Sequence, residues 1–231
     1  MKIRIAKFIA DSGIASRRTA EDMIMRGLVS VNNKKIDTPV FFVDESDVVI
    51  VDGKKISIHP QTKLYAFHKP INTMTTRADP MGRKTIYDIL PNEYKNLKYI
   101  GRLDYKTTGL LLMTNDGELA RKMTLPSSHI PRTYIANVYG DLSKLDSARS
   151  GITIRGTKYA PMKIDVIDNK TLRIEIDEGK KNEIRIVLST IGAPVKKLHR
   201  ISFGKIQLGN LPVGKIREIN QKTIDLILKS F

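Results

Sequence analysis

Asp104 is the residue of this 231-residue chain whose surroundings best suit chemistry. It follows Arg102-Leu103, precedes a Tyr-Lys-Thr-Thr-Gly segment, and is separated by that segment from the apolar run Leu110 to Thr114. The run predicts a short buried strand, which would hold the far end of the Asp104 loop rigid. A carboxylate on such a loop can serve as a nucleophile, although most aspartates in glycine-containing loops only form turns or caps.

Composition excludes several other kinds of chemistry. The chain has no cysteine and four scattered histidines, so it cannot use a disulfide, a thiolate or a cysteine-ligated metal, and we expect no zinc site. No apolar run approaches the roughly 20 residues of a membrane span. Arg4, Lys7 and Asp11 interrupt the N-terminus, which therefore lacks the apolar core of a signal peptide. We expect a cytoplasmic protein without a membrane partner.

The charge of the chain indicates a polyanionic partner. It has 40 Lys and Arg against 24 Asp and Glu, a net charge of +16 and a pI near 9.9. Residues 1–57 contain 10 basic and 8 acidic residues, so most of the surplus lies later, and no acid occurs between Glu183 and Glu218. The alternative is a lysine-rich surface that serves only solubility.

Residues 1–57 predict a small unit of two helices followed by a short sheet. Apolar residues at helical spacing from Ile5 to Ile9 predict the first helix, and Ser16 is placed to cap a second one that ends at Gly27. The predicted strands that follow are residues 28–31 and 48–51.

Two stretches of this unit resemble the S4 RNA-binding domain, namely the Ser-Arg-Arg helix start at residues 16–18 and Arg-Gly-Leu-Val-Ser-Val-Asn at residues 26–32. In that family the basic helix start faces RNA. The resemblance therefore makes Lys7, Arg17 and Arg18 candidate phosphate contacts. Solvated charges in the first turn of a helix are the alternative reading of the two arginines.

Residues 58–63 are short and polar and predict a linker, followed by one larger unit at residues 64–231. Strand patterns dominate this unit, and residues 162–167 and 171–176 are spaced to pair as an antiparallel hairpin. The other predicted elements are strands at 64–67 and 134–139, a short helix after Thr85, and a helix at 183–191 with Asn182 as its N-cap. Arg185 would lie at the rim of that last helix's apolar face, within reach of the neighbouring sheet.

Four segments, in order, resemble the motifs of pseudouridine synthases, in particular the S4-domain-containing family that modifies ribosomal RNA. The second segment, residues 101–120, reads GRLDYKTTGLLLMTNDGELA and carries the catalytic motif. The other three are residues 65–91 with Lys-Pro and Gly-Arg-x-Thr, residues 131–140 with Tyr134, and residues 178–219 with Arg185 and Val-x-x-Leu-x-Arg. The first and last resemble the subgroup that acts on 23S rRNA of the large subunit more than the small-subunit subgroup.

The resemblance implies an α+β fold. We expect an S4 domain at residues 1–57 and, at 64–231, a mixed, mainly antiparallel β-sheet catalytic domain with flanking helices. It also implies isomerisation of a uridine, in which the N-glycosidic bond is cut, the base turns, and C5 is joined to the ribose. Because the atoms balance, no cofactor and no metal are required.

The resemblance also assigns roles to named residues. Asp104 becomes the nucleophile, and Arg185 its partner, because a carboxylate in a water-poor pocket stays ionised only beside a compensating charge. Tyr134 would stack on the uracil and relay the C5 proton, with a plain strand tyrosine as the alternative. The uridine must leave its helix to react, and Arg102 would occupy the vacated stack or contact a phosphate.

The remaining candidate RNA contacts lie along the larger unit. Lys69 and Lys181 are read as phosphate contacts rather than bases, and Asn182 and Arg200 belong to the closing motif. Asn182-Glu183 departs from the His-Gln found there in other branches, and Ile186 stands where a second arginine is common.

Three alternatives differ in function. The same reaction on 16S rRNA and a non-catalytic S4 assembly factor both fit a basic chain, but a pure binder does not need Asp104, Tyr134 and Arg185. A metal-dependent nuclease would require clustered carboxylates, which do not accompany Asp104. We expect a monomer that acts on 23S rRNA in a precursor or an assembling subunit.

Overall fold

A computed structural model describes residues 2–44, 46–56 and 61–229. The chain folds into two compact units, which are described separately. The first unit comprises Met1–Lys63 with the short segments Asn96–Lys98 and Asn115–Gly117, and the second comprises the remaining residues from Leu64 onward. The predicted linker lies partly outside the described residues, since they do not include residues 58–60.

The first unit contains the two predicted helices and a four-stranded antiparallel sheet in the order β3-β2-β5-β6. The Oγ of Ser16 accepts a hydrogen bond from the backbone N–H of Thr19, which confirms the predicted cap. Sequence patterns missed the short outer strands because they are three-residue runs of Lys-Lys-Ile. The element bounds are β1 Ile3–Arg4, α1 Ile5–Asp11, α2 Arg17–Met25, β2 Val29–Val31, β3 Lys34–Ile36, β4 Phe42–Val43, β5 Val49–Val51 and β6 Lys54–Ile56.

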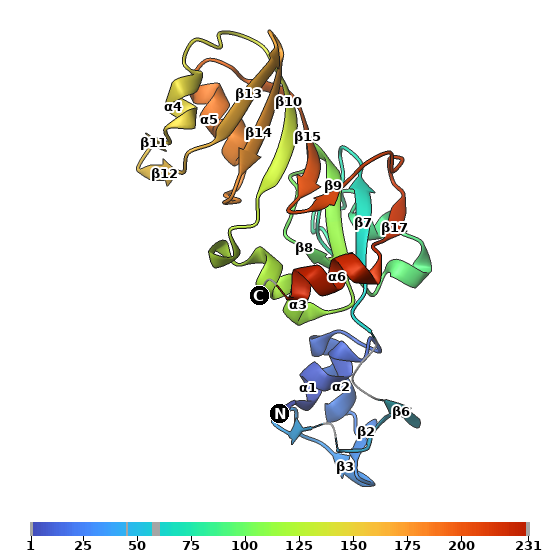
Figure 1. The fold of residues 1–231 in the computed structure, drawn as a ribbon. Coiled ribbons are helices and arrows are strands. Elements are labelled where there is room, and N and C mark those ends of the chain that lie inside the picture. The colour runs from blue at the N-terminus through green and yellow to red at the C-terminus, as the bar shows by residue number, and fades with distance from the viewer. Residues whose placement is uncertain (1, 45, 57–60, 230–231) are drawn as a thin grey trace. The chain divides into compact units, whose positions relative to one another are not determined.

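The second unit is built on one large mixed sheet (Figure 1), and the fold is α+β, as predicted. Its main strand order is β13-β14-β10-β15-β9-β7-β17, and only the β15–β9 pair in this path is parallel. The predicted hairpin of β13 and β14 is confirmed. The strand bounds are β7 Leu64–Lys69, β8 Lys98–Ile100, β9 Thr107–Thr114, β10 Arg132–Val138, β11 Ile152–Ile154, β12 Thr157–Tyr159, β13 Lys163–Asp168, β14 Thr171–Ile176, β15 Val195–Phe203, β16 Ile206–Gln207 and β17 Ile216–Glu218.

Helices cover the two halves of this sheet (Figure 1). Leu119 and Met123 of α3 and Ile224 of α6 share a core with the β7 and β9 residues Leu64 and Leu112. The α4 and α5 helices lie beside the β13–β14 half. The helix bounds are η1 Ile86–Asp88, η2 Asn92–Tyr94, α3 Gly117–Thr124, η3 Pro126–Ser128, α4 Leu145–Arg149, α5 Glu183–Thr190 and α6 Gln221–Leu228. None of the helices in the described ranges is long and apolar enough to cross a membrane.

Strand β9 begins earlier than its apolar run suggests. Thr107 to Gly109, predicted as loop, are strand residues paired with Lys69 of β7 and with Leu198 to Arg200 of β15. Gly109 has φ +106°, and a Cβ there would lie 2.2 Å from the carbonyl oxygen of Arg200. The glycine therefore permits close approach of β9 to β15, and only three residues, 104 to 106, lie between Leu103 and the start of β9 at Thr107.

Candidate active site

Asp104 is the first residue of a tight turn that leads into β9. The backbone N–H of Thr107 donates to the carbonyl oxygen of Asp104 at 2.9 Å, which closes the turn. The carbonyl oxygens on either side also accept hydrogen bonds. The donors are Thr75 Oγ1 to Leu103 (2.8 Å), the Asn72 N–H to Tyr105 (2.9 Å), Arg185 Nη2 to Lys106 (3.0 Å) and Lys69 Nζ to Thr107 (2.9 Å). Five successive carbonyls are thus held, so the half-buried Asp104 side chain is presented from a fixed backbone.

The carboxylate faces a cleft of about 920 Å³ within the second unit. Residues from five separate stretches of the chain meet there, namely 74–83, 101–107, 124–134, 176–185 and 198–203, and the order of the motifs in the sequence does not reveal this. The predicted site residues that line the cleft are Arg102, Asp104, Tyr134, Lys181, Asn182, Arg185 and Arg200. A cleft of this size is large enough for a nucleotide and its neighbouring phosphates.

Arg185 holds the turn rather than the carboxylate. The prediction of an Asp104–Arg185 ion pair is wrong, because no cation of the described residues lies within 4.0 Å of the Asp104 carboxylate. The Arg185 guanidinium donates instead to the carbonyls of Lys106 and Val195, and so ties the turn to the start of β15 as the predicted reach to the sheet required. Burial lowers the pKa of Arg185, and the Asp104 charge opposes that shift.

Lys69 is not a phosphate contact, contrary to the prediction from its motif. Its side chain is fully buried at the end of β7, and Nζ donates to the carbonyls of Pro70 and Thr107 at 3.0 and 2.9 Å. Burial lowers the pKa of Lys69 to about 8, opposed by the charge of Asp104. The strand pattern ended at Phe67, whereas β7 continues through Lys69 and carries it under the Asp104 turn.

Tyr134 lies beside Arg200 in the sheet, at the wall of the cleft. The two residues are directly paired between β10 and β15, and Arg200 is paired in turn with Gly109 of β9. Cross-strand partners point to the same face, so Tyr134, Arg200 and Lys69 form one row that runs beneath the Asp104 turn. The Tyr134 hydroxyl makes no hydrogen bond with any described residue and is free for a substrate atom.

The three predicted phosphate contacts of the first unit, Lys7, Arg17 and Arg18, differ in exposure and in their charge partners. Arg17 and Arg18 are exposed in the first turn of α2, as a phosphate contact requires. Lys7 is half-buried and forms an ion pair of 2.9 Å with Asp11 on the same helix, so its charge is already compensated. Of the three predicted phosphate contacts, Lys7 is therefore the one that the structure supports least.

The cleft contains residues that sequence reasoning missed. Arg132 lies two positions before Tyr134, and this spacing in a strand places it on the same face, so the alternation of β10 is the signal that could have identified it. Phe203 lacks any such signal. Glu183 is buried at the start of α5, where its Oε2 accepts the Lys180 N–H at 3.0 Å. Burial and the neighbouring carboxylate of Glu178 raise the pKa of Glu183 to about 7.

Asn182 does not cap α5 through its side chain, although it occupies the predicted N-cap position. Its backbone is left-handed at φ +54°, and its side chain makes no capping hydrogen bond. The Glu183 carboxylate binds the N–H of Lys180, two residues before the N-cap, and so holds the segment that leads into α5, while Asn182 lines the cleft.

Comparison with known proteins shows the family of each part of the chain. Residues 63–190 match the family described as RNA pseudouridylate synthase, and residues 3–49 match the S4 domain. The chain is 38% identical to an uncharacterized RNA pseudouridine synthase of Aquifex aeolicus, over 100% of this chain and 95% of that protein. It is 36% identical to ribosomal large subunit pseudouridine synthase B of Bacillus subtilis, over 94% of this chain and 91% of that protein.

A solved structure extends the likeness to the fold. The crystal structure of a pseudouridylate synthase superposes with a TM-score of 0.70 at 25% identity, over 97% of this chain and 99% of that one. Sequence, fold and the composition of the cleft therefore lead to the same conclusion, that the chain belongs to the S4-domain-containing RNA pseudouridine synthases.

Proposed function

We propose that this RNA pseudouridine synthase modifies one uridine of 23S ribosomal RNA, in the cytoplasm and in a precursor or an assembling large subunit. The support is the similarity to the Bacillus subtilis protein named for the large subunit, together with the first and last motifs of the sequence. A 16S substrate is the alternative.

The observation that carries the catalytic assignment is the turn at Asp104, whose backbone is held at five successive carbonyls beside the cleft. In the proposed reaction the Asp104 carboxylate promotes cleavage of the bond between N1 and the ribose C1′. The uracil turns, C5 bonds to C1′, and C5 gives up the proton that N1 requires, so substrate and product are isomers. A fixed backbone keeps the carboxylate at the ribose while the base moves.

The other cleft residues then have separate tasks. Tyr134 provides a flat face for the uracil, and its hydroxyl, which has no protein partner within the described residues, is available to take the C5 proton. Arg102 is exposed at the cleft, and in this proposal it fills the stack that the uridine leaves. Arg17 and Arg18 of the S4 domain would add phosphate contacts on the flanking RNA.

The test begins with the RNA. Carbodiimide mapping of 16S and 23S rRNA from a strain lacking this protein should show one 23S pseudouridine missing, restored by the wild-type gene. Loss of a 16S site instead would transfer the proposal to the small subunit.

The Asp104→Asn variant tests the residue. The amide keeps the size and the turn but cannot act as a nucleophile, so we expect unchanged rRNA binding and no pseudouridine above background. Product formed by this variant would overturn the role of Asp104.

A further inference from the structure

Two buried arginines share one aromatic ring at the wall of the cleft. The guanidinium carbons of Arg132 and Arg200 lie 4.9 and 5.3 Å from the centroid of the Phe203 ring. Arg132 is 9% exposed and Arg200 is 2% exposed, and all three residues line the cleft. A phenyl face stabilises a cation, but two cations on one ring also repel each other.

A β-bulge in β15 creates this arrangement. Arg132 pairs with Phe203 and Tyr134 pairs with Arg200, so β15 contains one more residue than β10 over this interval. In a regular strand Arg200 and Phe203, three positions apart, would point to opposite faces of the sheet. The extra residue returns both side chains to the face of Tyr134.

The two charges have no acidic partner at ion-pair distance within the described part of the chain. Arg132 donates Nη1 to the carbonyl of Asp177, and Arg200 donates Nε to the carbonyl of Leu110 at 2.6 Å. The Nη2 of Arg200 is buried and has no hydrogen-bond partner. Burial lowers the pKa of Arg132; Tyr134 opposes that shift, the Arg200 charge adds to it, and Asp177 and Glu183 oppose it to a smaller extent.

A buried donor without a partner and two cations without a counter-charge destabilise the fold unless a ligand accepts the hydrogen bond and supplies negative charge. A planar guanidinium pair matches the oxygens of a phosphate, to which each arginine can donate two hydrogen bonds. Tyr134, the strand partner of Arg200, lies next to the pair, so the anion would belong to the nucleotide whose base stacks on that tyrosine or to its direct neighbour.

We propose that Arg132 and Arg200 form a binding site for one phosphodiester group next to the target uridine. This inference rests on the cleft being the uridine site, but not on which ribosomal RNA is modified. The site fixes the sugar-phosphate backbone of the extruded nucleotide, so that the ribose stays at Asp104 while the uracil turns against Tyr134.

The test replaces single phosphates by neutral methylphosphonates. A short RNA that contains the modified uridine, taken from whichever rRNA the protein modifies, is made with one such linkage at each position in turn. Binding is measured to the Asp104→Asn protein, so that turnover does not interfere. We expect one linkage, adjacent to the uridine, at which neutralisation weakens binding about ten- to hundredfold.

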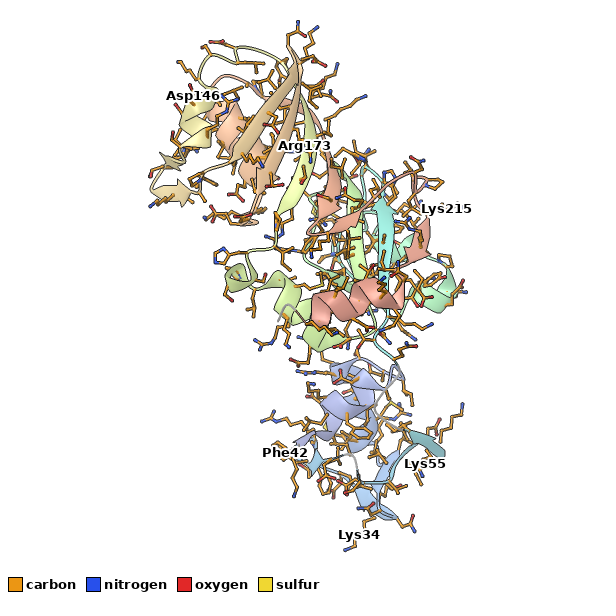
Figure 2. The ribbon with its side chains drawn as sticks, in the orientation of Figure 1. Lys34, Phe42, Lys55, Asp146, Arg173 and Lys215 are labelled. Atoms are coloured by element: carbon orange, nitrogen blue, oxygen red, sulfur yellow. The ribbon has the colours of Figure 1, made fainter. Side chains whose placement is uncertain are left out.

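Adding Arg132→Gln to this protein should weaken binding of the natural RNA by a similar factor. It should also reduce the slope of the logarithm of the binding constant against the logarithm of the salt concentration by about one. The same variant should no longer respond to the methylphosphonate at that one linkage, since the partner of that phosphate is gone. Arg173→Gln is the matched control. Arg173 is an exposed arginine on β14 (Figure 2), opposite Ile135 and on the other face from Tyr134, and its variant should respond at every linkage as the parent does.

Two results would overturn the proposal. In one, each methylphosphonate weakens RNA binding by the Arg132→Gln protein as much as it weakens binding by the parent. In the other, Arg132→Gln in the Asp104-containing enzyme lowers kcat while RNA affinity is unchanged, which would assign the pair to the uracil as it leaves with negative charge.

If Arg132→Gln fails to fold, Arg132→Lys replaces it. Lysine keeps the positive charge but not the two parallel N–H donors of the guanidinium, so the methylphosphonate at the same linkage should weaken binding less than it does in the parent. If neither rRNA is modified, the proposed function fails. The anion site is then tested by calorimetry, which should show that the wild-type protein binds uridine 3′- or 5′-monophosphate more tightly than uridine. Equal binding of the three would reject the site.

Discussion

Arg185 donates from Nη2 to the carbonyl oxygen of Lys106 at 3.0 Å, two residues beyond Asp104, and within the described residues it forms no ion pair with the Asp104 carboxylate. Its second bond, from Nη1 to the carbonyl of Val195 at 3.1 Å, fastens the same turn to β15. The arginine therefore acts on Asp104 through the backbone, with its charge as a longer-range contribution.

Arg185→Lys should lower kcat about 100-fold, because one ammonium cannot hold the two carbonyls in the geometry of the guanidinium fork, and a small displacement of a nucleophile has an effect of this size. Arg185→Gln should lower it at least as much, and RNA affinity should change little in either variant. Single-turnover rates and equilibrium binding separate the two effects. Near-normal turnover of Arg185→Lys would show that the positive charge alone is what Asp104 needs.

Gly109→Ala should destabilise the second unit by about 3 kcal/mol or more, because the added Cβ would lie 2.2 Å from the backbone oxygen of Arg200 and the residue has φ +106°. Gly156→Ala is the control. Gly156 has φ +79° with nothing within 4 Å of an added Cβ, so it should cost only about 1–2 kcal/mol from the backbone conformation. Urea unfolding of both variants measures the difference, and equal costs would mean that β9 and β15 can separate freely.

Glu183→Gln should remove a loss of stability that the wild-type protein suffers between about pH 4.5 and 7. The pKa of Glu183 is raised from 4.5 to about 7, so in this interval the folded state binds the extra proton and stability falls as the pH rises. The amide keeps an acceptor for the Lys180 N–H and cannot ionise. Urea unfolding across this range should show that the free energy of unfolding of the variant rises relative to that of the wild type as the pH rises. Glu93→Gln, at an exposed position, should show the same pH dependence as the wild type.

Lys69→Met should remove a pH dependence of stability that has the opposite sign and lies at higher pH. The pKa of Lys69 is lowered from 10.5 to about 8, so between these values the unfolded state binds more protons and the wild type gains stability as pH rises. The methionine variant lacks this gain. Stability of wild type relative to variant should therefore rise between about pH 8 and 10.5. Lys215→Met, at an exposed lysine (Figure 2), should leave the wild-type slope intact, and a matching slope for Lys69→Met would mean that Lys69 is solvated.

The sequence by itself determined the fold class and the main helices and strands, and it proposed Asp104, Tyr134 and Arg185 as site residues, all three of which line the cleft. Local patterns are sufficient for this. The cap at Ser16, the spacing within α5 and the hairpin of β13 and β14 are set by residues only a few positions apart.

The tertiary structure alone decided what these residues touch. Arg185 reaches Lys106 rather than Asp104 because the start of β15 and the turn before β9 are brought side by side by a parallel pairing about 90 residues apart in sequence. Lys69, which the sequence predicts as a phosphate contact, is fully buried because β7 extends under the turn. Arg200 and Phe203 face the same cleft only because β15 contains a bulge. A bulge is defined by the register between two strands, which neither strand's own sequence of alternating residues specifies.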